Sequence, residues 1–305
     1  MTDTHATRSE PTPVGSTAPE PRPGIDALVP PEMARRAESL GAAKCRMELP
    51  RLFTLAVLAG AFIALGALFS TTVTAGSGAL PWGVTRLLGG LTFSLGLVLV
   101  VVGGAELFTG NVLILMARAS GAVRMREVLR NWAVVFAGNA VGALATAALV
   151  FASGQYRFGG GAVGAAALAI AEHKSALGLL PAFLLGVLCN ALVCLAVWLS
   201  YSARTTTDRI LAVVPPVTAF VACGLEHSIA NLYFVPLGLC IRDFAPPGFW
   251  SSIGGSPSDH AGLSWLGFLT RDLPAVTAGN LAGGGLLVGA VYAFVYRRPR
   301  EVRTH

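Results

Sequence analysis

A glutamate and a histidine lie side by side in the middle of a long apolar segment. Glu226 and His227 follow the run FVACGL and precede SIANLYF. An ionisable side chain inside a membrane is costly unless it is paired or faces water, so it is a functional candidate by default. Imidazole gains or loses a proton near neutral pH. His227 is therefore a candidate for binding an anion or relaying a proton.

A second apolar segment carries the same spacing. The windows 104–111 (GAELFTGN) and 224–231 (GLEHSIAN) both read Gly-x-Glu-x-x-x-x-Asn. Because Glu106 matches Glu226, a scaffolding role is the better interpretation of both carboxylates. Thr109 in the first window has a hydroxyl that can donate or accept a hydrogen bond. Gly110 beside it permits the backbone geometry that a turn needs.

The composition indicates a polytopic membrane protein. Of the 305 residues, 54% are hydrophobic and only 12% are charged, whereas a soluble domain has roughly 25% charged residues. A soluble enzyme, a disordered chain and a coiled coil are poor interpretations. The five cysteines form no Cys-x-x-Cys pair, which argues against a metal site or a disulfide framework.

Six apolar segments are long enough to cross a bilayer, and they lie at about 52–73, 87–117, 131–152, 177–200, 210–241 and 273–296. The second and the fifth are longer than one crossing needs, and Glu106 and Glu226 interrupt them. We expect each of these two to be a broken helix, with two half-helices joined by a loop at membrane depth. The predicted fold is an all-α integral membrane protein with six transmembrane helices.

The matching windows indicate an internal repeat. A second pair of windows, 137–142 and 278–283, reads Ala-Gly-Asn-x-x-Gly in the same order along the chain. Each copy has three spans, so the second copy must cross the membrane upside down. Inverted repeats with broken helices place a permeation site near the midplane. Half-helix N-termini there favour a small anion through their free N–H groups.

Basic residues predict the orientation and the domain limits. Cytoplasmic loops are rich in Lys and Arg, and with both termini inside only Arg86, Arg157, Lys174, Arg242 and Arg271 fall on the other side. The net charge of +6 therefore reports basic loops rather than a nucleic-acid partner. We expect a disordered tail at 1–30, an amphipathic helix at 31–51, a channel domain at 52–297 with repeats at about 52–153 and 176–297, and a basic tail at 298–305.

The quoted residues resemble one family. The windows 104–111, 131–144 (NWAVVFAGNAVGAL), 189–201 (CNALVCLAVWLSY) and, above all, 220–238 (FVACGLEHSIANLYFVPLG) are similar to the formate/nitrite transporters. The resemblance extends from about residue 30 to 296. The stretch 241–244 (IRDF) and the Phe-Trp pair that follows fit the bacterial formate channel branch. The Asn-Pro-Ala motifs of water channels do not occur.

The resemblance implies an aquaporin-like fold, assembled as a homopentamer in the bacterial cytoplasmic membrane, without a cofactor. The family's central histidine falls on His227 and its loop threonine on Thr109. Its hydrophobic gates fall on Phe93, Leu97, Leu107, Phe108 and Phe220, although ordinary helix packing explains each of these equally well. Its polar supporting positions fall on Lys44, Lys174, Asn190, Glu226 and Asn280.

The expected function is passage of a small monovalent anion, formate first, coupled to protons. Lys174 would concentrate the anion at the vestibule. The anion then either takes up a proton and passes as neutral acid, with His227 supplying or relaying it, or stays charged beside a protonated His227. Nitrite is the alternative substrate, with hydrosulfide and lactate behind it. A membrane enzyme built on Glu226 and His227 lacks a nucleophile, and a scaffold leaves the helix breaks without a purpose.

Overall fold

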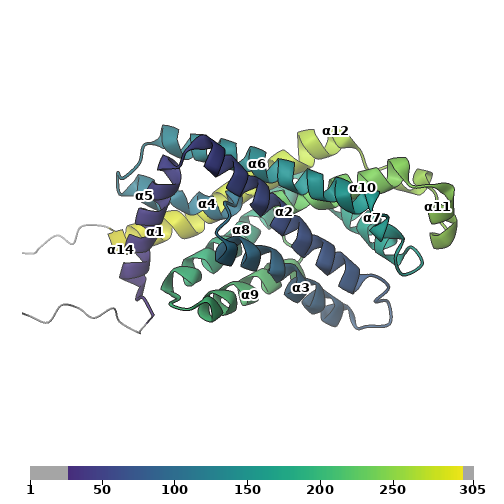
Figure 1. The fold of residues 1–305 in the computed structure, drawn as a ribbon, viewed down its shortest axis with the longest axis horizontal. Coiled ribbons are helices and arrows are strands. Elements are labelled where there is room, and N and C mark those ends of the chain that lie inside the picture. The colour runs from purple at the N-terminus through teal and green to yellow at the C-terminus, as the bar shows by residue number, and fades with distance from the viewer. Residues whose placement is uncertain (1–26, 298–305) are drawn as a thin grey trace, which may run out of the picture.

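The structure is a computed structural model that describes residues 27–297, in which all regular secondary structure is helical. The expected tails at 1–30 and 298–305 therefore lie almost entirely outside the described residues. Within the described residues, five helices are long and apolar enough to cross a membrane by length and composition: α2 (Leu49–Thr74), α3 (Trp82–Gly103), α6 (Met125–Ala152), α8 (Leu179–Ser202) and the segment Pro257–Tyr296. They form an elongated body (Figure 1).

The expected second and fifth segments are each divided between helices. After α3 the chain leaves helical geometry and resumes as α4 (Phe108–Asn111), which continues through a 3-10 turn into α5 (Leu115–Ala119). Likewise, five residues separate the end of α9 (Thr206–Ala222) from the start of α10 (Ser228–Phe244). Each of these two is 17 residues long, so neither counts among the five long helices.

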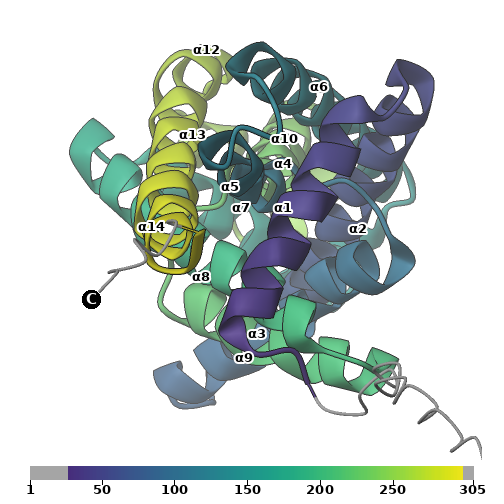
Figure 2. The same ribbon diagram turned by 90° about the vertical axis from the view of Figure 1, so that its left-hand side faces the viewer.

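The amphipathic helix is shorter than the expected 31–51. Helix α1 (Pro30–Arg46) ends before an extended Met47, and α2 begins at Leu49. Pro50 fits this boundary, because a proline has no N–H to donate to the Arg46 carbonyl and so cannot continue α1, whereas it is tolerated in the first turn of α2. Helix α1 lies at one end of the body, next to α5 and α14 (Val291–Arg297), in the view of Figure 2.

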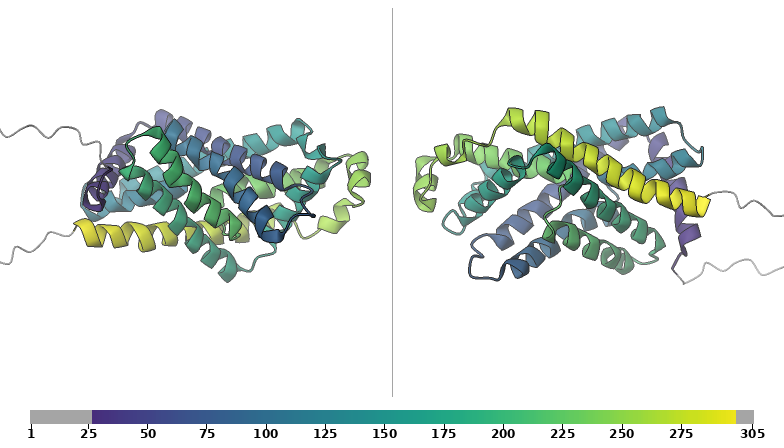
Figure 3. Two further views of the ribbon diagram at one scale, coloured as in Figure 1. Left: turned by 90° about the horizontal axis from the view of Figure 1, so that it is seen from below. Right: turned by 180° about the vertical axis from the view of Figure 1, so that it is seen from behind.

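Helices outside the six apolar segments form the opposite end. Helix α7 (Ala162–Ser175) follows three glycines with positive φ, and α11 (Pro247–Ile253) follows α10. Both lie far from α1 (Figure 1). The last segment is nearly continuous: α12 (Trp265–Gly267) and α13 (Leu273–Ala282) alternate with the wider π-helical turns Phe268–Asp272 and Gly283–Ala290 before α14, as Figure 3 shows from behind.

The Ala-Gly-Asn-x-x-Gly windows are helix contacts. A Cβ at Gly142 of α6 would collide with the Val57 carbonyl oxygen of α2, and one at Gly283 would collide with the Val187 carbonyl oxygen of α8. Glycine lets helix backbones approach this closely. The motif therefore holds α6 against α2 and α13 against α8, and it sets the asparagine between its glycines beside the helix breaks.

Candidate functional site

The two helix breaks have the same backbone path. Gly104 and Gly224 end α3 and α9 with φ of 77° and 72°, a left-handed conformation that glycine adopts without strain. The residue after each glycine donates its N–H to the Val100 or Phe220 carbonyl, 3.0 Å away in both cases. The next N–H, of Glu106 or Glu226, reaches a carbonyl of a neighbouring helix. Both windows thus fold into one kind of turn.

Asn139 and Asn280 tie these turns to the neighbouring helices with matching bonds. The Oδ1 atom of Asn139 accepts the Phe108 N–H at 2.8 Å, and that of Asn280 accepts the Ser228 N–H at 2.9 Å. Each Nδ2 donates to the carbonyl of the glutamate in its own turn and to a carbonyl of α2 or α8. Both asparagines are fully buried, so their side-chain amides must find hydrogen-bond partners within the protein instead of water.

In each window the glutamate binds both the asparagine and a lysine. In the second window, Asn231 Nδ2 donates to Glu226 Oε2 at 2.7 Å, and Lys174 Nζ of α7 lies 3.0 Å from Glu226 Oε1. In the first window, Glu106 binds Asn111 at 2.7 Å and Lys44 of α1 at 2.9 Å. These contacts are those of a scaffold. The charge of Lys174, whose side chain is 12% exposed, is offset by Glu226, so it attracts anions less than the sequence suggested.

Thr109 and His227 meet where the two breaks face each other. Thr109 Oγ1 lies 2.9 Å from His227 Nε2, and the residues are 0% and 2% exposed. On the other side of the ring, Nδ1 accepts the Ala230 N–H at 3.1 Å and so caps α10. An acceptor nitrogen carries no proton. The neutral ring therefore has its proton on Nε2 and donates it to Thr109 Oγ1, which leaves the threonine hydroxyl hydrogen free for a ligand.

Three backbone donors of the half-helix starts are already used. The N–H groups of Phe108, Ser228 and Ala230 bind Asn139, Asn280 and His227 respectively. The expectation that these N–H groups receive an anion is wrong for these three. Asn190 of α8 connects the halves, since its Nδ2 donates to the carbonyls of Thr109 at 3.2 Å and Asn280 at 2.7 Å.

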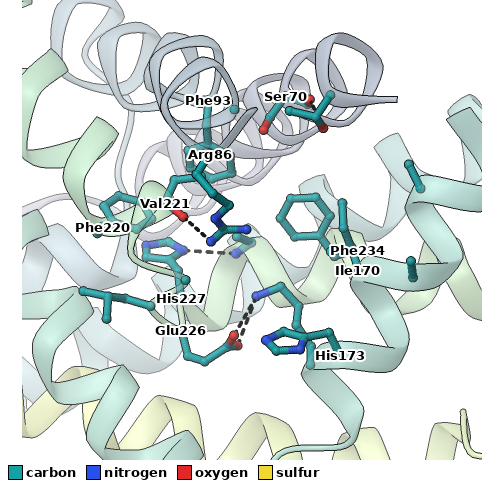
Figure 4. A pocket seen from close by; sticks show the side chains of 18 of the residues that line it. Ser70, Arg86, Phe93, Ile170, His173, Phe220, Val221, Glu226, His227 and Phe234 are labelled. Carbon is teal, nitrogen blue, oxygen red and sulfur yellow. Dashed lines mark hydrogen bonds and ion pairs between the residues drawn. The ribbon is translucent and has the colours of Figure 1, made fainter. Parts of the chain in front are cut away.

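A cavity of about 360 Å³ opens next to α7 and ends at His227 (Figure 4). We call it the α7 cavity, and its lining includes Arg86, Phe93, His173, Lys174, Phe220, Glu226 and Phe234. A second cavity, of about 280 Å³, opens next to α1 and ends at Leu97 and Leu107. We call it the α1 cavity, and its lining includes Arg36, Lys44, Glu106, Tyr201 and Arg209. Thr109 and His227 are both buried. His227 lines the α7 cavity, whereas Thr109 lines neither of the two cavities.

Apolar side chains face the cavities at their inner ends. Phe93 and Phe220 meet edge to face with centroids 5.7 Å apart, and Phe220 stacks on the His227 ring at 5.9 Å. Leu97 and Leu107 occupy the corresponding place in the α1 cavity, each 2% exposed. Phe108 differs from these four: within residues 27–297 its ring packs on Trp132 and Phe136 of α6 and lines neither cavity.

Sequence reasoning missed several contacts of the site. Arg86 of α3 donates to the Val221 and Ala222 carbonyls at 2.6 and 2.9 Å and so caps the open end of α9 (Figure 4). Asn139 stood in a recognised motif without an assigned role, although its match with Asn280 was a usable signal. No group of three or more His, Cys, Asp or Glu side chains suited to a metal ion occurs in the described part of the chain.

Comparison with known proteins assigns the family. The model of the family described as "Formate/nitrite transporter" matches residues 31–294. The chain belongs to the formate/nitrite transporter family. It is 45% identical over 277 residues to the formate channel FocA of Escherichia coli K12, covering 91% of this chain and 97% of that protein. It is 41% identical over 269 residues to FocA of Haemophilus influenzae, covering 88% and 95%.

Solved structures of this transporter family share the fold. One, a "Pentameric formate channel with formate bound", has a TM-score of 0.78 at 45% identity and covers 82% of this chain and 98% of its own. Another, an "FNT family ion channel", has a TM-score of 0.71 at 27% identity and covers 88% and 99%. The expected all-helical, membrane-spanning channel fold is thereby confirmed, and the chain is a membrane transporter rather than an enzyme.

Proposed function

We propose that this transporter conducts formate across the bacterial cytoplasmic membrane together with a proton. The observation that carries the proposal is the buried Thr109–His227 hydrogen bond at 2.9 Å, held between two cavities that end in apolar side chains. The 45% identity to formate channels over 91% of the chain supports formate as the substrate. Nitrite is the second candidate, because the matching family description names both anions.

The same proposal includes six spans arranged as an inverted repeat. In it, α3 with α4 and α5 forms the second span, and α9 with α10 forms the fifth. The matching turns at Gly104 and Gly224 and the matching bonds of Asn139 and Asn280 support this arrangement. A pentameric assembly is supported by the pentameric formate channel to which the chain is similar with a TM-score of 0.78. The domain limits of the channel, about 52–297, belong to this proposal.

Orientation follows from the basic residues. The α1 cavity carries Arg36, Lys44 and Arg209, and α1 and α5 lie at the same end of the body (Figure 1). Since cytoplasmic ends of membrane helices are rich in Lys and Arg, we place this end and both termini in the cytoplasm. The α7 cavity then opens to the outside.

Apolar side chains and polar groups have separate tasks in this mechanism. Phe93, Phe220, Leu97 and Leu107 act as the constrictions, because an apolar neck expels water and penalises a hydrated or bulky anion. A low-dielectric neck also favours the protonated, neutral form of a carboxylic acid. Phe108 supports the Thr109 turn from behind through its packing on α6.

Thr109 and His227 provide the hydrogen bonds that replace water in the neck. His227 Nε2–H donates to Thr109 Oγ1, and the threonine hydroxyl donates to an oxygen of the passing substrate. Because the Ala230 N–H occupies Nδ1, the ring serves as a fixed donor, and the proton that accompanies formate enters from the cavity water. Asn190, Asn280 and the pairs Lys174–Glu226 and Lys44–Glu106 hold the two turns in place.

Uptake of labelled formate into proteoliposomes tests the proposal. Unlabelled formate, nitrite, lactate and hydrosulfide compete in parallel at two pH values. We expect formate to compete best and uptake to be faster at acid pH, because protonation lowers the barrier of the apolar neck. Absence of formate uptake, or far stronger competition by nitrite, would overturn formate as the substrate while leaving the family assignment intact.

A further inference from the structure

The two cavities differ in how their cationic side chains are used. In the α7 cavity, Lys174 is paired with Glu226, and Arg86 donates to the two carbonyls that end α9. Both cations of that lining therefore already serve protein groups. The α1 cavity is lined by three cations against one carboxylate, Glu106, which pairs with Lys44.

Arg209 is the cation of the α1 cavity whose side chain binds no other group of the described residues. Arg36 donates one guanidinium N–H to the Tyr201 carbonyl at 3.1 Å and keeps its remaining donors. The side chain of Arg209, on the first turn of α9, has no hydrogen bond or ion pair to any group within residues 27–297. This side chain is half-buried and lines the cavity. A guanidinium in this position has all of its donors available to a ligand.

The carboxylate next to Arg209 in the chain, Asp208, does not pair with the Arg209 guanidinium. Asp208 Oδ2 accepts the N–H groups of Arg204 and Thr205 at 3.2 and 3.0 Å. The Thr205 backbone N–H holds the pKa of Asp208 below its usual range, so this carboxylate is ionised at neutral pH and remains in the cap of α9. Asp208 is exposed and is absent from the lining of the α1 cavity.

We propose that Arg209, together with Arg36 of the same lining, forms a docking subsite for a small two-oxygen monoanion in the α1 cavity. A guanidinium binds a carboxylate through two parallel N–H···O bonds, and formate and nitrite each present two oxygens. The subsite concentrates the anion on one face of the channel. The α7 cavity has no equivalent subsite, because Lys174 and Arg86 already bind protein groups. The inference rests on the proposed anion transport and adds a sidedness to it.

The consequence is a half-saturating concentration that differs between the two faces. A passive channel cannot shift the equilibrium, so the subsite changes capture from one side and leaves the final distribution unchanged. Removing the charge should raise the half-saturating concentration at the α1 face by roughly tenfold, within the range that focused charge gives for anion capture. The half-saturating concentration at the α7 face should change less than about twofold, because that lining keeps its own cations.

The test uses the purified full chain in proteoliposomes of one orientation, established by protease access to the N-terminus. Initial rates of labelled formate and labelled nitrite are measured from each face for the wild type, Arg209→Gln and Arg209→Lys. Arg126→Gln is the matched control, since Arg126 is an exposed cation of α6 outside both linings. Lysine keeps the charge without the planar fork, so Arg209→Lys should fall between the wild type and Arg209→Gln.

A higher half-saturating concentration for Arg209→Gln at the α1 face alone would support the subsite. This increase should be smaller at high salt, because screening weakens the charge. A half-saturating concentration that is unchanged at the α1 face, or that rises equally at both faces, would overturn the subsite. Formate flux through the wild type would still uphold the proposed function. Flux of nitrite without formate would overturn formate as the substrate, and the nitrite arm would still decide the subsite. Absence of any anion flux in the wild type would overturn both.

Discussion

Replacing His227 with asparagine separates the two uses of its ring. Nδ1 caps α10 by accepting the Ala230 N–H at 3.1 Å, whereas Nε2 faces Thr109 at 2.9 Å. The asparagine side-chain oxygen is as many bonds from the backbone as Nδ1, and asparagine is among the most favourable N-cap residues. His227→Asn therefore keeps the cap and removes the Nε2–H donor with every proton that the ring could exchange.

The size of the effect follows from one lost donor. A hydrogen bond to a charged or strongly polarised group contributes about 1.5–3 kcal/mol. The threonine hydroxyl remains in place, so the low end applies, and about 1.4 kcal/mol in the barrier is a tenfold slower flux. Thr109→Val, which removes the hydroxyl that donates to the substrate and keeps the branched shape, should slow flux by at least this factor. His227→Ala loses the cap as well, at a cost of about 1 kcal/mol in stability.

The dependence on pH decides between the two roles of the ring. Since the Ala230 N–H blocks Nδ1, the ring stays neutral during transport and the proton enters from cavity water. His227→Asn should then be slower than the wild type at every pH between about 5 and 8 but keep the acceleration toward acid pH. The assay is proteoliposome uptake of labelled formate, with the pentamer measured by size exclusion as the control for folding. Loss of the acid acceleration in His227→Asn would refute the argument, because it would show that the imidazole itself titrates.

Three further changes test the constriction and the scaffold. Phe220→Ala widens the neck beside His227 and should raise the lactate-to-formate flux ratio by about tenfold, since an apolar neck excludes by size; an unchanged ratio would remove Phe220 from the constriction. Asn280→Ala removes the acceptor of the Ser228 N–H and the amide donor to two carbonyls, and an unpaired buried group costs about 1–3 kcal/mol, so thermal stability and yield of folded protein should collapse. Glu226→Gln strands the buried charge of Lys174 and should destabilise by about 3–5 kcal/mol, whereas the double variant with Lys174→Met should regain much of the lost melting temperature.

Much of the scaffold was readable from the sequence because its parts are repeated. The repeated Gly-x-Glu-x-x-x-x-Asn spacing favours a scaffolding role for both carboxylates, and Glu226 accepts a hydrogen bond from Asn231 at 2.7 Å. Hydropathy likewise placed the long helices. What it could not give is the direction of a side chain: Phe108 and Leu107 are adjacent and equally apolar, yet one packs on α6 and the other lines the α1 cavity.

Contacts between distant segments were also beyond the sequence. Arg86 was classed by its side of the membrane, and nothing local indicates that its guanidinium reaches the carbonyls of Val221 and Ala222. Helix α7 was missed because its alanine-rich residues are too few for a span, although Lys174 depends on it. The N–H groups of Phe108 and Ser228 looked free because their partners, Asn139 and Asn280, come from other helices.

The matching windows separate the residues that build the turns from those that act in the pathway. Glu106 and Asn111 have the same types as Glu226 and Asn231 and form the same amide-to-carboxylate bond, so these positions carry structure common to both halves. At the position of His227 the first window has Leu107, and at the position of Thr109 the second has Ile229. The hydrogen bond at the centre therefore joins two residues that the repeat does not share. Substitutions at the shared positions should reduce folding, and substitutions at the unshared ones should change which anions pass and how fast.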